Sequence, residues 1–289
     1  MSKFIISIDS SCDISMDFCI KNDVKTLLMK YTIGEDEFKD TMEEEDIKKF
    51  YDKMRNGAVP KTSQINVNDY LVYFNKYVDN NLPIIHISLS SGLSGSYQNA
   101  EKAVEILKED NKAVNIKIID SLMASGGIVL PLLKLIEMRN AGKTADEAYE
   151  YVNSTIRTVN TFYTTPEMVY LYRGGRVKKI TALVAGALKM NPILKVDKNG
   201  KLVSHQVVPG EKRTFKRVLE LVEKGIDPNY NDYLIISHSD CLEKAQKFGD
   251  NLKEKYNFKE IIYTTIGTTI GAHTGPGLVA IFFYGDERK

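Results

Sequence analysis

Short apolar runs alternate with amphipathic segments in the first half of the chain, and this alternation restricts the fold more than any other feature of the sequence. The strand-like runs occupy residues 4–8, 25–33, 83–88 and 116–119. The helix-like segments occupy residues 42–55, 68–78, 95–110, 125–141 and 144–157, and capping-box sequences precede two of them, at 41–44 and 144–147. Strands that alternate with helices favour a parallel sheet flanked by helices. We therefore predict an α/β domain built on a parallel sheet.

The second half of the chain has a different pattern, in which several strand-like runs follow one another closely. These runs occupy residues 162–165, 193–197, 202–207, 233–237, 261–265 and 278–284, with helices expected at 181–189, 214–223 and 241–256. Asn199 and Gly200 lie between two of the runs, and Asn-Gly is typical of a β-hairpin turn. We therefore predict a second, α+β domain with a mixed sheet, and we divide the 289 residues into domains 1–158 and 159–289.

Composition and cysteine pattern argue against several classes of protein. Lys and Arg number 39 and Asp and Glu 38, so the net charge of +1 gives no general attraction to nucleic acid or to anionic membranes. The three cysteines form no CxxC motif and the histidines have no zinc spacing, so we expect no disulfide framework, no metal and no cofactor. The apolar runs are shorter than the ~20 residues of a membrane span, and the N-terminus lacks a signal-peptide core. We expect a cytoplasmic protein without integral membrane association.

Short polar side chains follow three of the predicted strands at the point where each strand ends. Asp9 and Ser10 follow the first strand, Ser90 and Ser91 follow the third, and Asp120 follows the fourth. The carboxyl ends of parallel strands meet at one edge of a sheet, where α/β proteins bind their ligands. The sequence therefore predicts a binding site at this edge.

One interpretation of the serine-rich segment SLSSGLSGSYQNA, residues 88–100, is a catalytic nucleophile. Residues 92–96 nearly match the nucleophile elbow G-x-S-x-G, although Ser96 replaces the last glycine. Ser94 would be the nucleophile, His273 the base and Asp120 the third member of a triad. A serine esterase that uses Ser94 and His273 is thus an alternative function. A small-molecule kinase subunit is disfavoured, because no phosphate-binding loop motif is present.

A second interpretation of the same segment is a cradle for an anion. A helix expected from Gly95 offers unpaired N–H groups and a partial positive charge, and the hydroxyls of Ser94 and Thr62 would add directional donors. The nearest basic residue in these two segments is Lys61, so the site fits one carboxylate held without a salt bridge. The plainer alternative is that the serines only cap the helix.

Several motifs across nearly the whole chain together resemble the DegV family of fatty-acid-binding proteins. They are DSSCDI at 9–14, TSQ at 62–64, SSGLSGSYQ at 90–98, DS at 120–121, GGR at 174–176, PIL at 192–194 and HTGPG at 273–277. The resemblance implies two α/β domains with a long-chain fatty acid buried between them. It also implies a carrier without turnover of its own, which presents the acid to a separate ATP-dependent fatty acid kinase for conversion to an acyl phosphate.

The resemblance also implies roles for particular residues. Thr62 and Ser94 would hold the carboxylate, with Gly95 and the His273 loop nearby, and we include Ser63 in the predicted carboxylate site. The glycine-rich segment 267–277 is expected to be a loop, in which His273 either contacts the ligand or is held by backbone partners. Arg176, in a basic cluster, is the candidate for docking the kinase, and a solvated surface is the alternative.

The acyl chain needs an apolar wall, and three segments are candidates for it. They are residues 128–136, 162–163 and 183–188. Apolar stripes of this kind are more often plain core, which remains the alternative for each residue.

Overall fold

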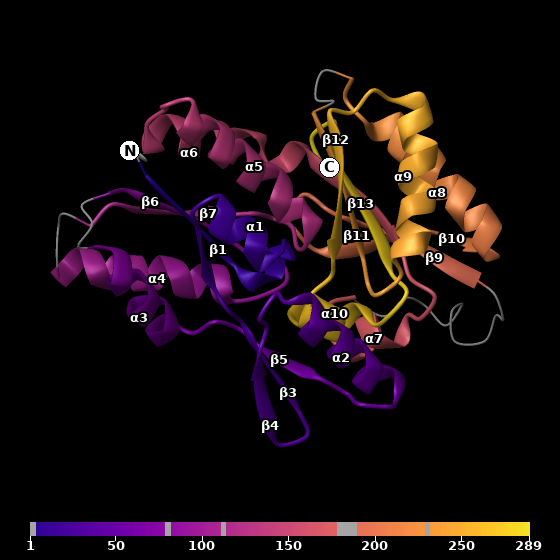
Figure 1. The fold of residues 1–289 in the computed structure, drawn as a ribbon, viewed down its shortest axis with the longest axis horizontal. Helices are drawn as coiled ribbons and strands as arrows, with labels where there is room; N and C mark the ends of the chain where they lie inside the picture. Colours follow the sequence, from indigo (N-terminus) through magenta and orange to yellow (C-terminus); the bar gives the residue numbers. More distant parts are fainter. Residues whose placement is uncertain (1–3, 79–81, 111–113, 178–189, 229–231) are drawn as a thin grey trace.

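Two large sheets lie side by side in the computed structural model of the chain (Figure 1), and a small third sheet lies below them in that view. The structure describes residues 4–78, 82–110, 114–177, 190–228 and 232–289. The predicted helix at 181–189 lies outside these residues. The mixture of a parallel and a mixed sheet, each covered by helices, confirms the predicted fold class.

The first sheet is parallel throughout, as the strand–helix alternation predicts. Its strand order is β2-β1-β6-β7, and the strands are β2 (Val24–Leu27), β1 (Ile5–Asp9), β6 (Ile84–Ser88) and β7 (Ile116–Asp120). One face is covered by α3 (Val67–Val78) and α4 (Ser96–Asp110). The other face meets α1 (Met16–Lys21), α5 (Gly126–Asn140) and α6 (Ala145–Thr155). Both faces are therefore buried, and β1 and β6 are apolar along most of their length.

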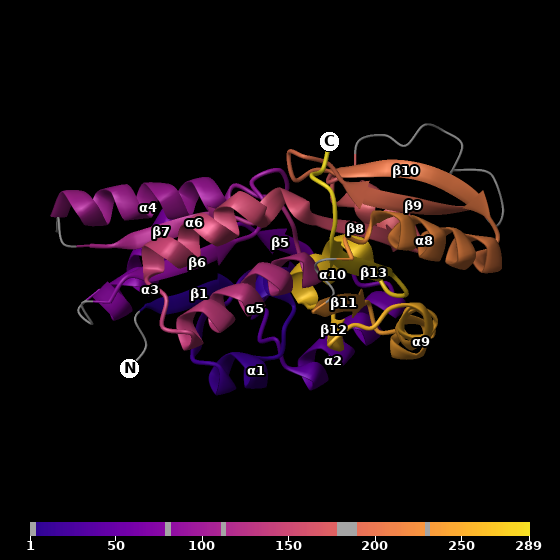
Figure 2. The ribbon, with the colours of Figure 1, turned by 90° about the horizontal axis from the view of Figure 1, so that it is seen from above.

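The second sheet is mixed, with the strand order β10-β9-β8-β13-β11-β12. Only β11 and β12 pair in parallel among its described strands. The strands are β8 (Val159–Thr164), β9 (Met190–Val196), β10 (Leu202–Pro209), β11 (Tyr233–His238), β12 (Glu260–Thr265) and β13 (Val279–Tyr284). Helices α8 (Glu211–Gly225) and α9 (Leu242–Lys255) cover one face (Figures 1 and 2). Strand β13 lies between β8 and β11, although it follows both in chain order.

Helix α5 packs against the second sheet as well as beside the first. It covers the face opposite α8 and α9, where it meets β8, β11 and β13. A Cβ atom on Gly126 would lie 2.6 Å from Ser237 Oγ and 2.8 Å from Phe282, so the glycine allows this close approach. The two halves of the chain therefore share one apolar core through α5, and the division at residues 158 and 159 stays a prediction.

The β9–β10 hairpin extends from the second sheet to the serine-rich loop of the first. Its turn forms at residues 197–200 as predicted, and Gly200 adopts a positive φ of 71°. Ser90 Oγ donates a hydrogen bond to Gly200 O over 2.9 Å. Gly92 leaves no room for a side chain, because a Cβ there would lie 2.7 Å from the backbone of Gly200. The hairpin tip thus rests on the loop that follows β6.

The prediction of a single strand at 25–33 is wrong, because these residues form parts of two strands that belong to different sheets. Residues up to Leu27 belong to β2, and β3 (Lys30–Ile33) pairs with β4 (Asp36–Lys39) and β5 (Lys61–Ser63) in a small antiparallel sheet. These short strands are mainly polar, so their sequences carry little strand signal.

Of the two predicted capping boxes, the second is confirmed and the first is wrong. Thr144 and Glu147 form both reciprocal hydrogen bonds at the start of α6. Helix α2 (Glu44–Arg55) instead begins after Glu43, and Thr41 Oγ1 donates to Asp46 Oδ2 over 2.9 Å. Thr41 Oγ1 also accepts from Glu43 N over 3.3 Å, so Thr41 binds the chain just before α2 and a carboxylate in its first turn without forming the predicted box.

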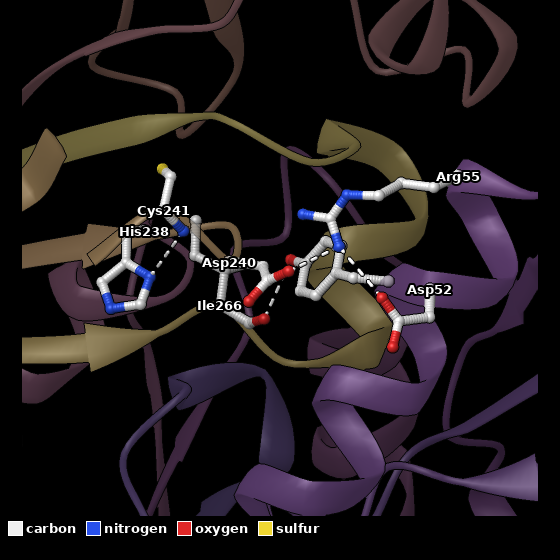
Figure 3. Close-up of polar contacts among 7 residues, drawn as sticks. Asp52, Arg55, His238, Asp240, Cys241 and Ile266 are labelled. Carbon is white, nitrogen blue, oxygen red and sulfur yellow. Dashed lines mark hydrogen bonds and ion pairs between the residues drawn. The ribbon is translucent and has the colours of Figure 1, made fainter. Parts of the chain in front are cut away.

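Helix α2 also joins the two halves of the chain (Figure 3). Arg55 forms ion pairs with Asp240, in the loop after β11, at 2.6 Å and with Asp52 at 3.3 Å. Tyr51 OH donates to Ile266 O, after β12, over 2.9 Å. These contacts fix the loops of the second sheet against the first half. None of the described helices is both long enough and apolar enough to cross a membrane.

Candidate ligand-binding site

The carboxyl ends of β1, β6 and β7 lie together, as the polar residues at these ends predict. The serine-rich loop follows β6 and is held by side chains at the ends of β1 and β7. Asp9 accepts from Leu89 N over 2.9 Å, and Asp120 accepts from Ser91 N over 3.0 Å. Asp9 is fully buried, and this burial raises the pKa of its carboxyl. The two carboxylates therefore bind the backbone of the serine-rich loop, and neither of them binds the hydroxyl of Ser94.

Ser94 and Gly95 lie at the start of α4, directly beside the segment 62–64. Ser94 Oγ accepts from Ser96 N over 3.2 Å and lies 2.9 Å from Ser96 Oγ, so the capping interpretation is correct in part. A Cβ on Gly95 would collide with the side-chain amide of Gln64. Gly95 therefore allows Thr62, Ser63 and Gln64 to approach the serine loop.

His273 lies on helix α10 (Thr268–Thr274) and not in a loop, which corrects the expectation for 267–277. Its Nε2 is 2.7 Å from Thr62 Oγ1, so the structure joins two residues that are far apart in sequence. Burial, with a smaller contribution from the charge of Arg176, lowers the pKa of His273 to about 4. The imidazole is therefore neutral at neutral pH, and its contact with Thr62 is a hydrogen bond between uncharged groups.

Two buried carboxylates fix the N-terminus of α10, and sequence reasoning missed this role. Asp13 accepts from Gly267 N over 2.9 Å, and Asp40 accepts from Thr268 N over 3.2 Å and from Thr269 N over 3.3 Å. Burial raises the pKa of both carboxyls, and the charge of Asp40 raises the pKa of Asp13 further. In the sequence, the DSSCD motif around Asp13 was the only feature that drew attention to either carboxylate. These bonds set the position of the helix that carries His273.

An apolar cavity with an open mouth lies against these residues. Four of the residues predicted from sequence for the carboxylate site line it: Thr62, Ser63, Ser94 and His273. Gly95 does not line it. Apolar wall residues come from both halves of the chain, among them Leu89, Leu93, Val196, Leu278, Ala280 and Phe282. The cavity thus has a hydrogen-bonding region at Thr62, Ser94 and His273 and a mainly apolar wall that contains a few further hydroxyls.

Arg176 lines the same cavity, where the sequence predicted no basic residue. Its Nη1 donates to Gly174 O over 2.6 Å and its Nε to Leu93 O over 3.4 Å. Desolvation lowers the pKa of its guanidinium. Arg176, Thr62 and His273 also line a second hollow at the surface, together with Lys61 and Arg173. These three side chains therefore separate the apolar cavity from a basic surface hollow.

The apolar wall differs from the expected segments. Tyr163 lines the cavity, but Phe162 packs on the opposite face of β8 and residues 128–136 do not line it, because α5 fills the space between the sheets. Segment 183–188 lies outside the described residues.

The catalytic triad of the esterase alternative is not assembled. Ser94 Oγ contacts Ser96, His273 contacts Thr62, and Asp120 accepts from the backbone amides of Ser91 and Leu122. Among the described residues, no cluster of His, Cys, Asp and Glu suits a metal ion.

The fold and the site define a class of α/β proteins in which residues from two sheets enclose an apolar cavity with a polar end. The chain belongs to the DegV family, because the family model described as "Uncharacterised protein, DegV family" matches residues 3–286. A DegV domain-containing protein of Clostridium perfringens is 33% identical over 290 residues, with 100% of both chains covered.

Two further relatives come from Thermotoga maritima. One, a fatty acid-binding protein, is 29% identical over 294 residues, with 99% of both chains covered. The other is a solved structure of a DegV lipid binding protein, with a TM-score of 0.86 and 28% identity over 99% of this chain and 100% of that chain. These two relatives of the chain are thus a fatty acid-binding protein and a lipid binding protein.

Proposed function

We propose that this protein binds one long-chain fatty acid, with the carboxylate at Thr62, Ser94 and His273 and the acyl chain in the apolar cavity. The observation that carries the proposal is the 2.7 Å contact of Thr62 with His273 at the border of a mainly apolar cavity that Ser94 also lines. Neutral donors suit a single carboxylate. The fatty acid-binding relative from Thermotoga maritima supports the same ligand class.

The acyl chain would supply most of the affinity. Burial of a methylene group contributes about 0.8 kcal/mol, so about fifteen of them represent on the order of 12 kcal/mol before the costs of association. A hydrogen bond to a charged group contributes about 1.5–3 kcal/mol. The polar residues would therefore set the orientation of the acid more than its affinity.

The surface hollow suggests how the bound acid is used. Thr62 and His273 border both the cavity and the hollow, so a carboxylate held there is within reach from outside. A separate ATP-dependent kinase would dock over Arg176 and Arg173, whose charges suit nucleotide phosphates. A carboxylate oxygen would attack the terminal phosphorus of ATP, the bond to ADP would break, and an acyl phosphate would form. The protein itself would act as a carrier.

Native mass spectrometry of the purified full-length protein tests the proposed ligand. We expect an added mass equal to one long-chain acid, and one equivalent of added palmitic acid should occupy any empty fraction. A protein that is reproducibly empty and ignores added acid would contradict the proposal.

The combined variant Thr62→Val and Ser94→Ala tests the carboxylate site. Loss of two hydrogen bonds to a charged group should slow acyl phosphate formation by a partner kinase about 30-fold or more, and binding should weaken less, since the acyl chain dominates affinity. The matched control combines Thr32→Val with Ser154→Ala, which lie outside the cavity. Equal rates for the two double variants would reject these residues as the carboxylate site.

A further inference from the structure

Two hydroxyl groups interrupt the apolar wall of the cavity on strand β8. Thr161 and Tyr163 both line the cavity and are 4% and 5% exposed. Neither Thr161 Oγ1 nor Tyr163 OH has a hydrogen-bond partner in the part of the chain that the structure describes. Both hydroxyls are thus shut off from solvent and left without a protein acceptor.

The neighbours of these hydroxyls on the sheet are apolar. Thr161 pairs with Phe282 on β13, and Tyr163 pairs with Ala280 on β13 and with Leu194 on β9. Valine and phenylalanine have nearly the same shapes as threonine and tyrosine and would avoid the cost of a buried, unpaired hydroxyl. If the wall contacted only an alkyl chain, valine and phenylalanine at these positions would therefore be more stable than threonine and tyrosine.

Strand geometry places the backbone of Thr161 and Tyr163 along the wall that leads away from the helix of His273. Strand β13 runs away from α10, so Leu278, Ala280 and Phe282 lie successively farther from the helix that carries His273. Thr161, opposite Phe282, is two residues or roughly 7 Å farther along the wall than Tyr163, opposite Ala280. The two residues thus flank the chain of a bound acid and not its head.

We propose that the cavity selects a long-chain acid with a hydroxyl group on the acyl chain, held by Tyr163 and Thr161. This inference rests on the proposed function and adds the substrate class. An alcohol can donate to one hydroxyl and accept from the other, whereas a saturated chain leaves both unpaired. A cis double bond offers only its weak π face as an acceptor.

Competition binding to the delipidated full-length protein tests the proposal. Octadecanoic acid, its 9-, 10- and 12-hydroxy derivatives and cis-9-octadecenoic acid would each displace a fluorescent fatty acid. We expect at least one hydroxy acid to bind about tenfold more tightly than octadecanoic acid. Tyr163→Phe combined with Thr161→Val should abolish this preference and strengthen binding of octadecanoic acid. Tyr263→Phe, on β12 and outside the cavity lining, is the matched control.

The outcomes separate this inference from the proposed function. If none of the acids binds, the fatty acid site itself is wrong and the inference falls with it. If all bind but no hydroxy acid exceeds octadecanoic acid, or if the double variant keeps the preference, only the inference is overturned. Tighter binding of the unsaturated acid than of every hydroxy acid would overturn it as well.

Discussion

Replacement of Ala280 by phenylalanine should weaken fatty acid binding about 1,000-fold while Thr62, Ser94 and His273 stay in place. Ala280 lies on β13, is 4% exposed and faces the cavity. The added ring would occupy the space of about five methylene groups, each of which contributes about 0.8 kcal/mol when buried. Displacement of a fluorescent fatty acid measures the dissociation constant, and native mass spectrometry should show that the purified variant is empty.

Ala280→Ser is the matched control, because it changes the same position without filling the cavity. Insertion of a large side chain into a packed wall costs about 1–3 kcal/mol, so thermal unfolding must show that Ala280→Phe is folded. A folded variant that binds the acid as tightly as Ala280→Ser would mean that the acyl chain lies elsewhere.

Replacement of His86 by asparagine should remove a large part of the acid sensitivity of the fold. His86 lies on β6, is 0% exposed, and its Nδ1 is 2.8 Å from Ser7 Oγ. Aromatic rings of Tyr70, Tyr73 and Phe74 surround it. This burial lowers the pKa of His86 to about 3.

The direction of the pH effect follows from this lowered pKa. The unfolded chain takes up a proton on His86 near pH 6.5, whereas the folded protein does so only near pH 3. The stability that a neutral His86 allows is therefore complete above pH 6.5 and is lost as the pH falls toward 3. By pH 4 the wild type should lose about 3 kcal/mol of unfolding free energy relative to His86→Asn.

Urea unfolding of both proteins between pH 7 and pH 4 measures this difference. The introduced asparagine would keep a partner for Ser7, and its smaller volume should lower stability equally at every pH. Buried Asp9, Asp13 and Asp40 have raised pKa values, so their contributions change in the opposite direction but cancel between the two proteins. Parallel pH profiles would show that His86 is not the group responsible.

The parts of the fold that the sequence predicts correctly are those with strong local signals. Strands β1, β6 and β7 are apolar runs that end in Asp9, Ser88 and Asp120, and the parallel sheet brings these ends together at the serine loop. The hairpin at Gly200 follows from its Asn-Gly turn. Ser94, His273 and Thr62 were singled out by the serine-rich and glycine-rich segments and again by the motifs of a resembling family, and the structure places all three on one cavity.

The missed features depend on contacts between distant parts of the chain. Helix α10 is short and lies in the glycine-rich segment 267–277, so the local sequence favours a loop, and Asp13 and Asp40 fix the helix from 254 and 228 residues away. The strands of the small sheet are too short and polar to show a period. The basic hollow at Arg176 likewise forms only when two remote segments meet. No local sequence pattern predicts these contacts between remote segments.

The position of β13 decides when the binding cavity can exist during biosynthesis. Strands β8 and β11 are translated well before the strand that joins them, so a nascent chain carries both with unpaired edges. Leu278, Ala280 and Phe282 leave the ribosome after the rest of the described wall. Under the proposed function, an acyl chain can be enclosed only after β13 has been translated, because a ribosome-bound intermediate without this strand lacks Leu278, Ala280 and Phe282.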